Sequence, residues 1–74
     1  MLMLNRDRRE LLDLMRRGRI VQTSGRIFRV TGTGNGKVRC DTQVRLLVDA
    51  GWARLAANGS TYELTEEGLE KMEN

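Results

Sequence analysis

Four polar side chains near the middle of the chain have the types and the spacing needed to read base edges in DNA. They are Arg39, Thr42, Gln43 and Arg45, and they share the outer side of a helix predicted over residues 38–50. Arginine binds guanine, and glutamine binds adenine, through paired hydrogen bonds in the major groove. The pattern therefore predicts a DNA-reading helix, and the alternative is the ordinary polar side of an amphipathic helix.

Six further residues before and after this helix have side chains that can meet the phosphate backbone. They are Arg26, Arg29, Lys37, Arg54, Asn58 and Ser60. Contacts to phosphate position a protein on a duplex without reading its base sequence. Together with the four polar residues of the helix, these six make up the candidate DNA-binding site.

The distribution of charge along the chain favours an anionic partner. Residues 1–45 hold eleven Lys and Arg against four Asp and Glu, a net charge of +7, whereas residues 46–74 hold two against six, a net charge of −4. The two parts sum to the +3 of the whole chain. This uneven distribution of charge indicates a basic face that binds an anionic partner. The alternative is a basic surface that is simply exposed to solvent.

Catalysis and metal binding are not expected. The chain has one cysteine, Cys40, and no histidine, which excludes zinc ligand sets and Cys/His or Ser/His nucleophile pairs. The glycine-rich residues 32–36, followed by Lys37, differ from a nucleotide-binding loop. Such a loop requires glycine where this chain has Thr31, and Ser or Thr where it has Val38. We therefore expect no enzymatic activity and no cofactor. The alternative for the glycine-rich residues 32–36 is a loop whose backbone amides contact a DNA phosphate.

Length and composition favour one small cytoplasmic domain over residues 1–74. A chain of this length buries only roughly 60% of its unfolded surface, which allows a modest core and no deep cleft. No apolar run approaches the ~18 residues needed to cross a bilayer. The apolar run over residues 1–4 is too short to form the core of a secretory signal. The lone cysteine fits a reducing compartment, and we expect it to be buried.

Three helices are predicted from their end signals. The first begins after Asn5, a good N-cap residue, and ends at Gly18. The second, over residues 38–50, ends at Gly51. The third begins at Thr65, a capping residue followed by two glutamates that suit the helix dipole.

Two hairpins are predicted between these helices. Residues 19–31 are rich in β-branched residues on either side of a Ser-Gly turn. The core-facing residues of this hairpin are expected to be Ile20, Phe28 and Val30. A further helix is then either absent or confined to residues 32–38. The second hairpin turns at Asn58 and Gly59, the strongest short hairpin signal, and Trp52 before it is expected to anchor the core.

The C-terminal half of the chain resembles the winged helix-turn-helix superfamily. The similarity lies in Val44, Leu47, the run Ala50, Gly51, Trp52 and Ala53, and the run Tyr-Glu-Leu-Thr-Glu-Glu-Gly over residues 62–68. The resemblance implies that the helix over residues 38–50 is the recognition helix and that residues 54–62 form the wing. It also implies base contacts from Arg39, Thr42, Gln43 and Arg45. The predicted hairpin in place of the usual second helix departs from the pattern of the superfamily.

A looser resemblance covers more of the chain. The runs Leu4-Asn5-Arg6, Gly18-Arg19-Ile20, Gly25-Arg26-Ile27 and Ala50-Gly51-Trp52, with residues 62–68, look like a small bacterial toxin family that inhibits DNA topoisomerase I. This resemblance implies a protein target in place of a base sequence.

The sequence therefore predicts an α+β winged-helix domain that binds double-stranded DNA, as a small transcriptional regulator of phage or plasmid origin. The alternative is an interaction or inhibitor module that acts on a DNA-processing enzyme such as a topoisomerase. A protein partner or a homodimer is compatible with either function, and no membrane association is expected.

Overall fold

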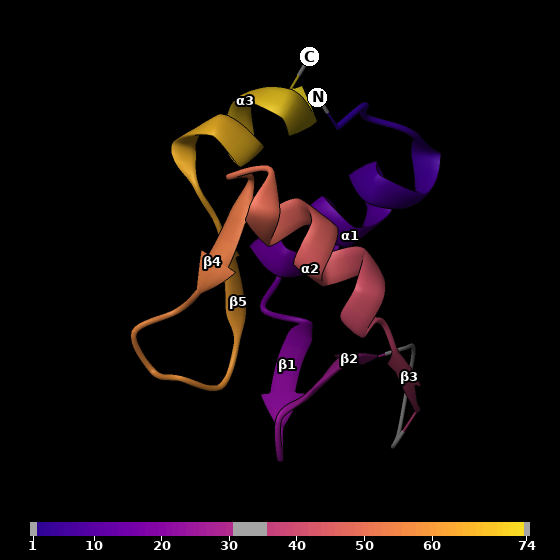
Figure 1. The fold of residues 1–74 in the computed structure, drawn as a ribbon, viewed down its shortest axis with the longest axis vertical. Helices are drawn as coiled ribbons and strands as arrows, with labels where there is room; N and C mark the ends of the chain where they lie inside the picture. Colours follow the sequence, from indigo (N-terminus) through magenta and orange to yellow (C-terminus); the bar gives the residue numbers. More distant parts are fainter. Residues whose placement is uncertain (1, 31–35, 74) are drawn as a thin grey trace.

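Three helices and two antiparallel sheets form the fold of residues 2–30 and 36–73, the parts of the chain that the computed structural model describes (Figure 1). In chain order the elements are α1 (Arg6–Arg16), β1 (Ile20–Thr23), β2 (Arg26–Val30), β3 (Lys37–Arg39), α2 (Asp41–Asp49), β4 (Ala53–Leu55), β5 (Tyr62–Leu64) and α3 (Glu66–Glu73). Strands β1, β2 and β3 form one sheet, and β4 and β5 form the other. The predicted α+β class is therefore confirmed.

The ends of α1 lie where the sequence predicts them. The side-chain oxygen of Asn5 accepts a hydrogen bond from the Arg8 amide at 2.8 Å, which satisfies one of the free amides of the first turn. At the other end Gly18 has a φ of +72°, and the Arg19 amide reaches back to the Leu14 carbonyl at 2.9 Å. This is the Schellman arrangement, in which a left-handed glycine ends a helix.

The second helix ends as predicted but begins later. Gly51 has a φ of +82°, and the Trp52 amide donates to the Leu47 carbonyl at 2.9 Å in the same type of cap. Residues 38 and 39, however, belong to β3 and not to the helix, which begins at Asp41. The prediction was wrong there because β2 offers these residues a ladder of hydrogen bonds.

A further helix over residues 32–38 is also not found within the described part of this segment. Residues 37 and 38 are extended, and the Cys40 amide donates to the Ile27 carbonyl at 3.0 Å. Residues 32–35, which include most of the predicted glycine-rich loop, lie outside the described part of the chain.

The three-stranded sheet turns one side toward the helices. Its register pairs Ile20 with Arg29 and places Ile27 on the same side, because cross-strand partners point in one direction. Ile20 and Ile27 are buried, so this is the inner side. Phe28 and Val30, predicted to face the core, lie on the outer side and are only partly buried. The prediction failed because β2 is apolar on both sides, so that the sequence pattern did not define its inward side.

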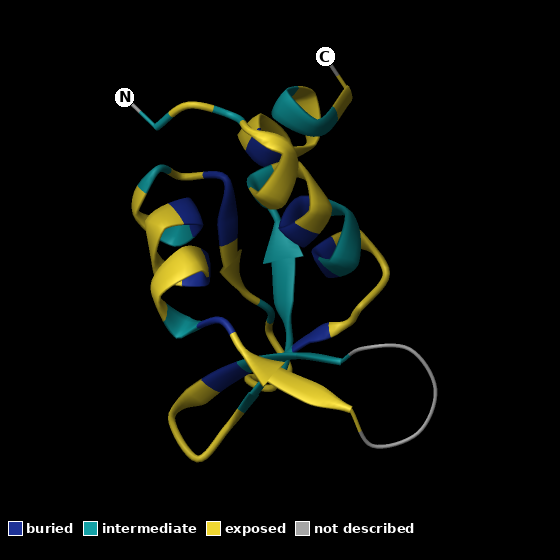
Figure 2. Cartoon of the chain, turned by 90° about the vertical axis from the view of Figure 1, so that its right-hand side faces the viewer, coloured by how far each residue is buried: buried dark blue, intermediate teal, exposed yellow. Residues whose placement is uncertain are grey.

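The core lies between α1, α2 and the inner sides of the two sheets (Figure 2). Its buried residues are Leu11, Leu12, Met15, Ile20, Ile27, Cys40, Val44, Leu47, Trp52 and Ala53. The predicted burial of Cys40 and Trp52 is confirmed, at 5% and 3% exposure.

Gln22 joins the two sheets. Its backbone amide donates to the Ser60 carbonyl at 2.7 Å, and its side-chain oxygen accepts from the Tyr62 hydroxyl at 2.7 Å. Beside it, Val21 and Thr61 form a single β-bridge. The hairpin of β1 and β2 therefore contacts the hairpin of β4 and β5, and the turn between β1 and β2 lies near the lower end of the molecule in Figure 1.

Helix α3 closes the fold through a close approach at Gly68. The Thr65 amide donates to the Trp52 carbonyl at 3.1 Å, and the Thr65 hydroxyl accepts from the Gly68 amide at 3.1 Å. A Cβ atom at Gly68 would lie only 1.9 Å from the Trp52 carbonyl oxygen. Only glycine therefore permits this contact between α3 and the start of β4.

We predict that Gly68→Ala destabilises the fold. Alanine normally stabilises a helix by up to about 1 kcal/mol relative to glycine, but here the backbone of Trp52 must move to admit the methyl group. Such overpacking costs about 1–3 kcal/mol, so the net effect on the free energy of unfolding is a loss. Urea denaturation measures it, and Glu70→Ala on the exposed side of the same helix serves as the control. A stabilised Gly68→Ala variant would contradict the prediction.

Candidate nucleic-acid interface

The outer side of α2 carries three of the predicted base-reading residues. Thr42, Gln43 and Arg45 are exposed, whereas Val44 and Leu47 on the opposite side are buried in the core. Arg45 forms no hydrogen bond or ion pair with another residue of the described ranges 2–30 and 36–73. Its guanidinium group therefore keeps all its donors for a ligand.

Arg39 does not share this helix face, contrary to the prediction. It lies on β3, and its Nε donates to a carboxylate oxygen of Asp41 at 2.9 Å. The other oxygen of Asp41 accepts the backbone amide of Ile27 at 3.0 Å. Asp41 thus ties β2 and β3 to the first turn of α2.

The contacts of Asp41 shift the ionisation of two groups. The hydrogen bond from Arg39 lowers the pKa of the Asp41 carboxyl below its ordinary value of 3.8, and the Ile27 amide adds to the shift because both donors favour the carboxylate. The same hydrogen bond raises the pKa of Arg39. Sequence reasoning missed this anchoring role, for which the available signal was an aspartate at the start of a helix that follows a β-rich segment.

The two hairpin arginines point to opposite sides of the sheet. Arg26 lies on the outer side, exposed and next to the turn. Arg29 lies on the inner side, where its Nη1 is 3.6 Å from a carboxylate oxygen of Glu10 on α1. The Nε of Arg29 is buried without a hydrogen-bond partner among the described residues. The structure therefore separates Arg29 from the other predicted phosphate contacts, whereas Lys37 is exposed on the same side as Arg26.

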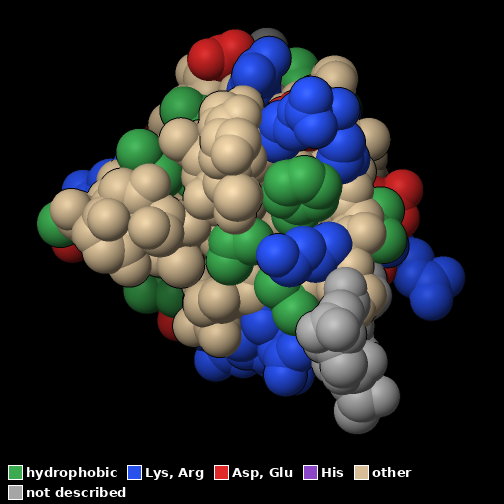
Figure 3. Space-filling model, turned by 90° about the horizontal axis from the view of Figure 1, so that it is seen from below, with side chains coloured by type: hydrophobic (Ala, Val, Ile, Leu, Met, Phe, Trp, Pro, Cys, Tyr) green, Lys and Arg blue, Asp and Glu red, His purple; other side chains and the backbone are tan. Residues whose placement is uncertain are grey.

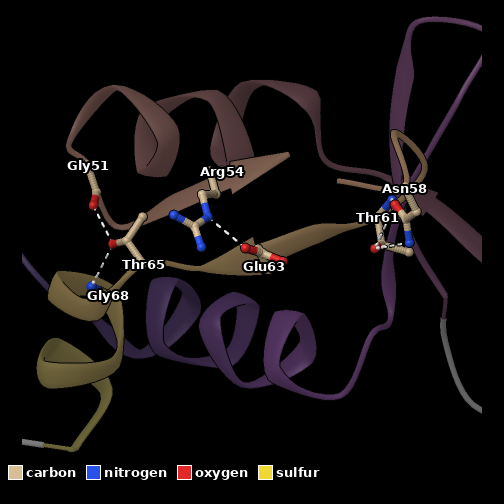
Figure 4. Close-up of polar contacts among 7 residues, drawn as sticks. All are labelled: Gly51, Arg54, Asn58, Thr61, Glu63, Thr65 and Gly68. Carbon is tan, nitrogen blue, oxygen red and sulfur yellow. Dashed lines mark hydrogen bonds and ion pairs between the residues drawn. The ribbon is translucent and has the colours of Figure 1, made fainter. Parts of the chain in front are cut away.

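The hairpin of β4 and β5, which contains the residues predicted to form a wing, uses most of its polar groups internally (Figure 4). The Nε of Arg54 lies 2.6 Å from a carboxylate oxygen of Glu63 on the opposite strand. The side-chain oxygen of Asn58 accepts the amides of Ser60, at 2.8 Å, and Thr61, at 3.1 Å. Of the three predicted wing contacts, only the exposed side chain of Ser60 has no such internal role.

An open hollow of about 290 Å³ separates the inner side of β2 and β3 from α1 and the start of α2. It is lined by Asp7, Glu10, Leu11, Arg29, Val38, Arg39, Cys40 and Gln43. Burial raises the pKa of the Cys40 thiol, which disfavours the reactive thiolate. No cluster of three or more Cys, Asp or Glu side chains that could hold a metal ion occurs among the described residues. The hollow therefore presents no catalytic or metal-binding set.

Basic residues gather at the end of the molecule where the β1–β2 hairpin lies. Figure 3 shows this end, with several Lys and Arg side chains around exposed hydrophobic ones and with Asp and Glu mainly at the margin.

Comparison of the chain with models of known protein families, with curated proteins and with solved structures gives no match. None of the helices in the described part has the length and the apolar composition to cross a membrane.

We predict that Asp41→Asn lowers the free energy of unfolding at neutral pH. Because the pKa of Asp41 is lowered in the folded state, its ionised form stabilises the fold above pH 3.8, and this contribution is lost as the pH falls through the lower folded-state pKa. The free energies of unfolding of Asp41→Asn and of the unaltered protein should therefore become more similar in acid below pH 3.8. Urea denaturation at several pH values measures both.

The control for this experiment is Asp49→Asn, which removes the same charge from the exposed last turn of α2. It should leave the free energy of unfolding unchanged or slightly raised, because a negative charge is unfavourable near a helix C-terminus. An Asp41→Asn variant with the same stability as the unaltered protein at neutral pH would contradict the role assigned to Asp41.

Proposed function

We propose that this chain binds double-stranded DNA by inserting the outer side of α2 into the major groove. The observation that carries the proposal is the exposure of Thr42, Gln43 and Arg45 on a short helix whose other side is held by the core. An α-helix fits the width of the major groove. A helix anchored at both ends by the contacts of Asp41 and Gly51 gives these side chains a fixed direction.

The N-terminal half of α2 is the part that would reach the bases. The exposed acid Asp49 lies at the other end of the helix and would repel phosphates if the whole helix lay in the groove. Leu46, which is 42% exposed beside Arg45, supplies an apolar surface that suits the methyl group of thymine. The helix would therefore enter the groove with its first turns, as recognition helices do.

Arg26 and Lys37 would hold the DNA backbone on one side of α2. Both are exposed on the outer side of the three-stranded sheet, and neither forms a hydrogen bond or ion pair with another described residue. Their contacts would position the protein on the duplex, while the helix supplies the base readout. On the other side the wing would contribute through Ser60 and through the terminal amino groups of Arg54, which Glu63 holds only by its Nε, whereas Asn58 is engaged within the turn.

The order of elements supports a winged-helix domain with a modified first part. A helix and strand, then α2, then a two-stranded ribbon follow the order of the superfamily that the C-terminal half resembles, with β2 and β3 in place of its second helix. In this proposal the protein is a small sequence-specific transcriptional regulator of a phage or plasmid. Selection of bound duplexes from a random-sequence pool tests the sequence specificity, and equal affinity for every duplex would reject it.

A second candidate function is inhibition of a DNA-processing enzyme such as DNA topoisomerase I. The observation that favours it is the exposure of Leu46 on α2 and Leu55 on β4, both 42% exposed on elements that contact each other. Apolar side chains of this kind suit a protein partner. Relaxation of supercoiled plasmid by topoisomerase I tests it, at a salt concentration that abolishes binding of this chain to DNA. Inhibition that persists supports the second candidate, and unchanged relaxation rejects it.

For the DNA-binding proposal, we predict that Arg45→Ala weakens binding to the selected duplex by about 1–3 kcal/mol, the usual contribution of an arginine that reads a base. Arg6→Ala is the matched control, since Arg6 is an exposed arginine at the start of α1 and has no partner among the described residues. It removes the same charge from a different helix and should change the affinity less than about threefold. Fluorescence anisotropy measures both, and equal losses in the two variants would reject base readout by Arg45.

A further inference from the structure

The outer side of the three-stranded sheet carries an apolar cluster that the core does not use. Val21, Phe28 and Val30 point to this side, because the register places their neighbours Ile20 and Ile27 in the core. All three are partly buried, yet they are not among the half-buried hydrophobic residues that pack against the core. An aromatic ring and two β-branched side chains therefore form a small surface of their own, which we call the outer sheet face.

Positive charge surrounds this apolar cluster. Arg26, Lys37 and Arg39 alternate with the apolar residues on the same side of β2 and β3, and the register places Arg39 directly opposite Phe28. On this side of the three strands, the described residues include no acid. Arg39 is held by Asp41 through its Nε alone, so its terminal amino groups remain without a described partner.

We propose that the outer sheet face binds single-stranded nucleic acid, with a base stacked on Phe28 and phosphates on Arg26, Lys37 and the terminal amino groups of Arg39. Unpaired bases stack on aromatic side chains of exposed sheets, and neighbouring cations neutralise the backbone. A duplex does not fit this chemistry, because its bases are stacked inside and offer no free face to a ring. This proposal does not depend on the binding of duplex DNA by α2.

The position of Phe28 within the sheet supports this choice of ligand. It lies on the middle strand, with Val21 opposite on β1 and Arg39 opposite on β3. Neighbouring strands are about 4.8 Å apart, so Val21 and Arg39 are the cross-strand neighbours of Phe28 on the two sides. A base over Phe28 would thus lie on apolar surface while its phosphate lies near positive charge. An acidic peptide would pair with the cations but would leave the aromatic ring unused.

The experiment measures binding of the complete chain to fluorescent oligothymidine and oligouridine of about 10 nucleotides, a length within the usual range of a small sheet domain. We expect Phe28→Leu, which keeps an apolar side chain at this position, to weaken binding roughly 5- to 150-fold, the loss typical of removing one stacking ring. Phe28→Tyr keeps the ring and should bind within about threefold of the unaltered protein. Comparison of the two oligonucleotides separates DNA from RNA as the preferred strand.

Two further measurements keep the proposal testable if Phe28→Leu does not fold. Lys37→Ala should reduce the salt dependence of oligonucleotide binding, because one fewer counterion is released. In the unaltered protein, NMR shifts on addition of oligothymidine or oligouridine should centre on the amides of Val21, Phe28 and Val30. Absence of binding to either oligonucleotide, equal affinity of a folded Phe28→Leu variant, or shifts confined to α2 would overturn the proposal. Arg45→Ala should leave single-strand binding unchanged, because Arg45 lies on α2, whereas Arg26 and Lys37 are common to this surface and the proposed duplex interface.

Discussion

The two-sided contact of Asp41 is the interaction on which the arrangement of this domain depends. One carboxylate oxygen binds the backbone amide of Ile27 on β2, and the other binds Arg39 at the end of β3. The Cys40 amide reinforces the junction through the Ile27 carbonyl. These contacts end the third strand, start the helix and fix the angle between them. Together with the core packing of Val44 and Leu47, this junction places the exposed residues of α2 relative to the outer sheet face.

The internal ion pairs decide which of the many arginines remain available to a ligand. Arg16 and Arg17 bind Asp13, Arg54 binds Glu63, and Arg29 lies near Glu10. Exposed pairs of this kind add little stability, but they neutralise charge where they form. The cations left without a described partner include Arg26, Lys37 and Arg45 on the sheet face and on α2, and Arg6 and Arg19 at the two ends of α1. Net charge alone would not have distinguished these available cations from the paired ones.

Local signals made most of the element ends predictable. Asn5, Gly18, Gly51 and the turn at Asn58 act through hydrogen bonds to residues within a few positions, so the sequence is sufficient to locate them. The third strand was not predictable in this way, because it exists through pairing with β2, and residues 37–39 have no strand signal of their own. The same distant pairing removed Arg39 from the helix and determined which side of β2 entered the core. Ion pairs across the sheets, such as that of Arg54, depend equally on register and lay beyond sequence reasoning.

The junction at Asp41 also links the two proposed surfaces physically, since Arg39 belongs to the sheet face and Asp41 to α2. A phosphate at Arg39 would share the guanidinium group with Asp41, which occupies only its Nε. Even if the phosphate displaced that hydrogen bond, Asp41 would keep the Ile27 amide and the Cys40 amide would keep its carbonyl partner. The direction of α2 would then be preserved, because the contacts of Asp41 and Cys40 with the Ile27 backbone do not involve the side chain of Arg39. A ligand on the sheet can therefore engage Arg39 without dismantling the helix that carries Arg45.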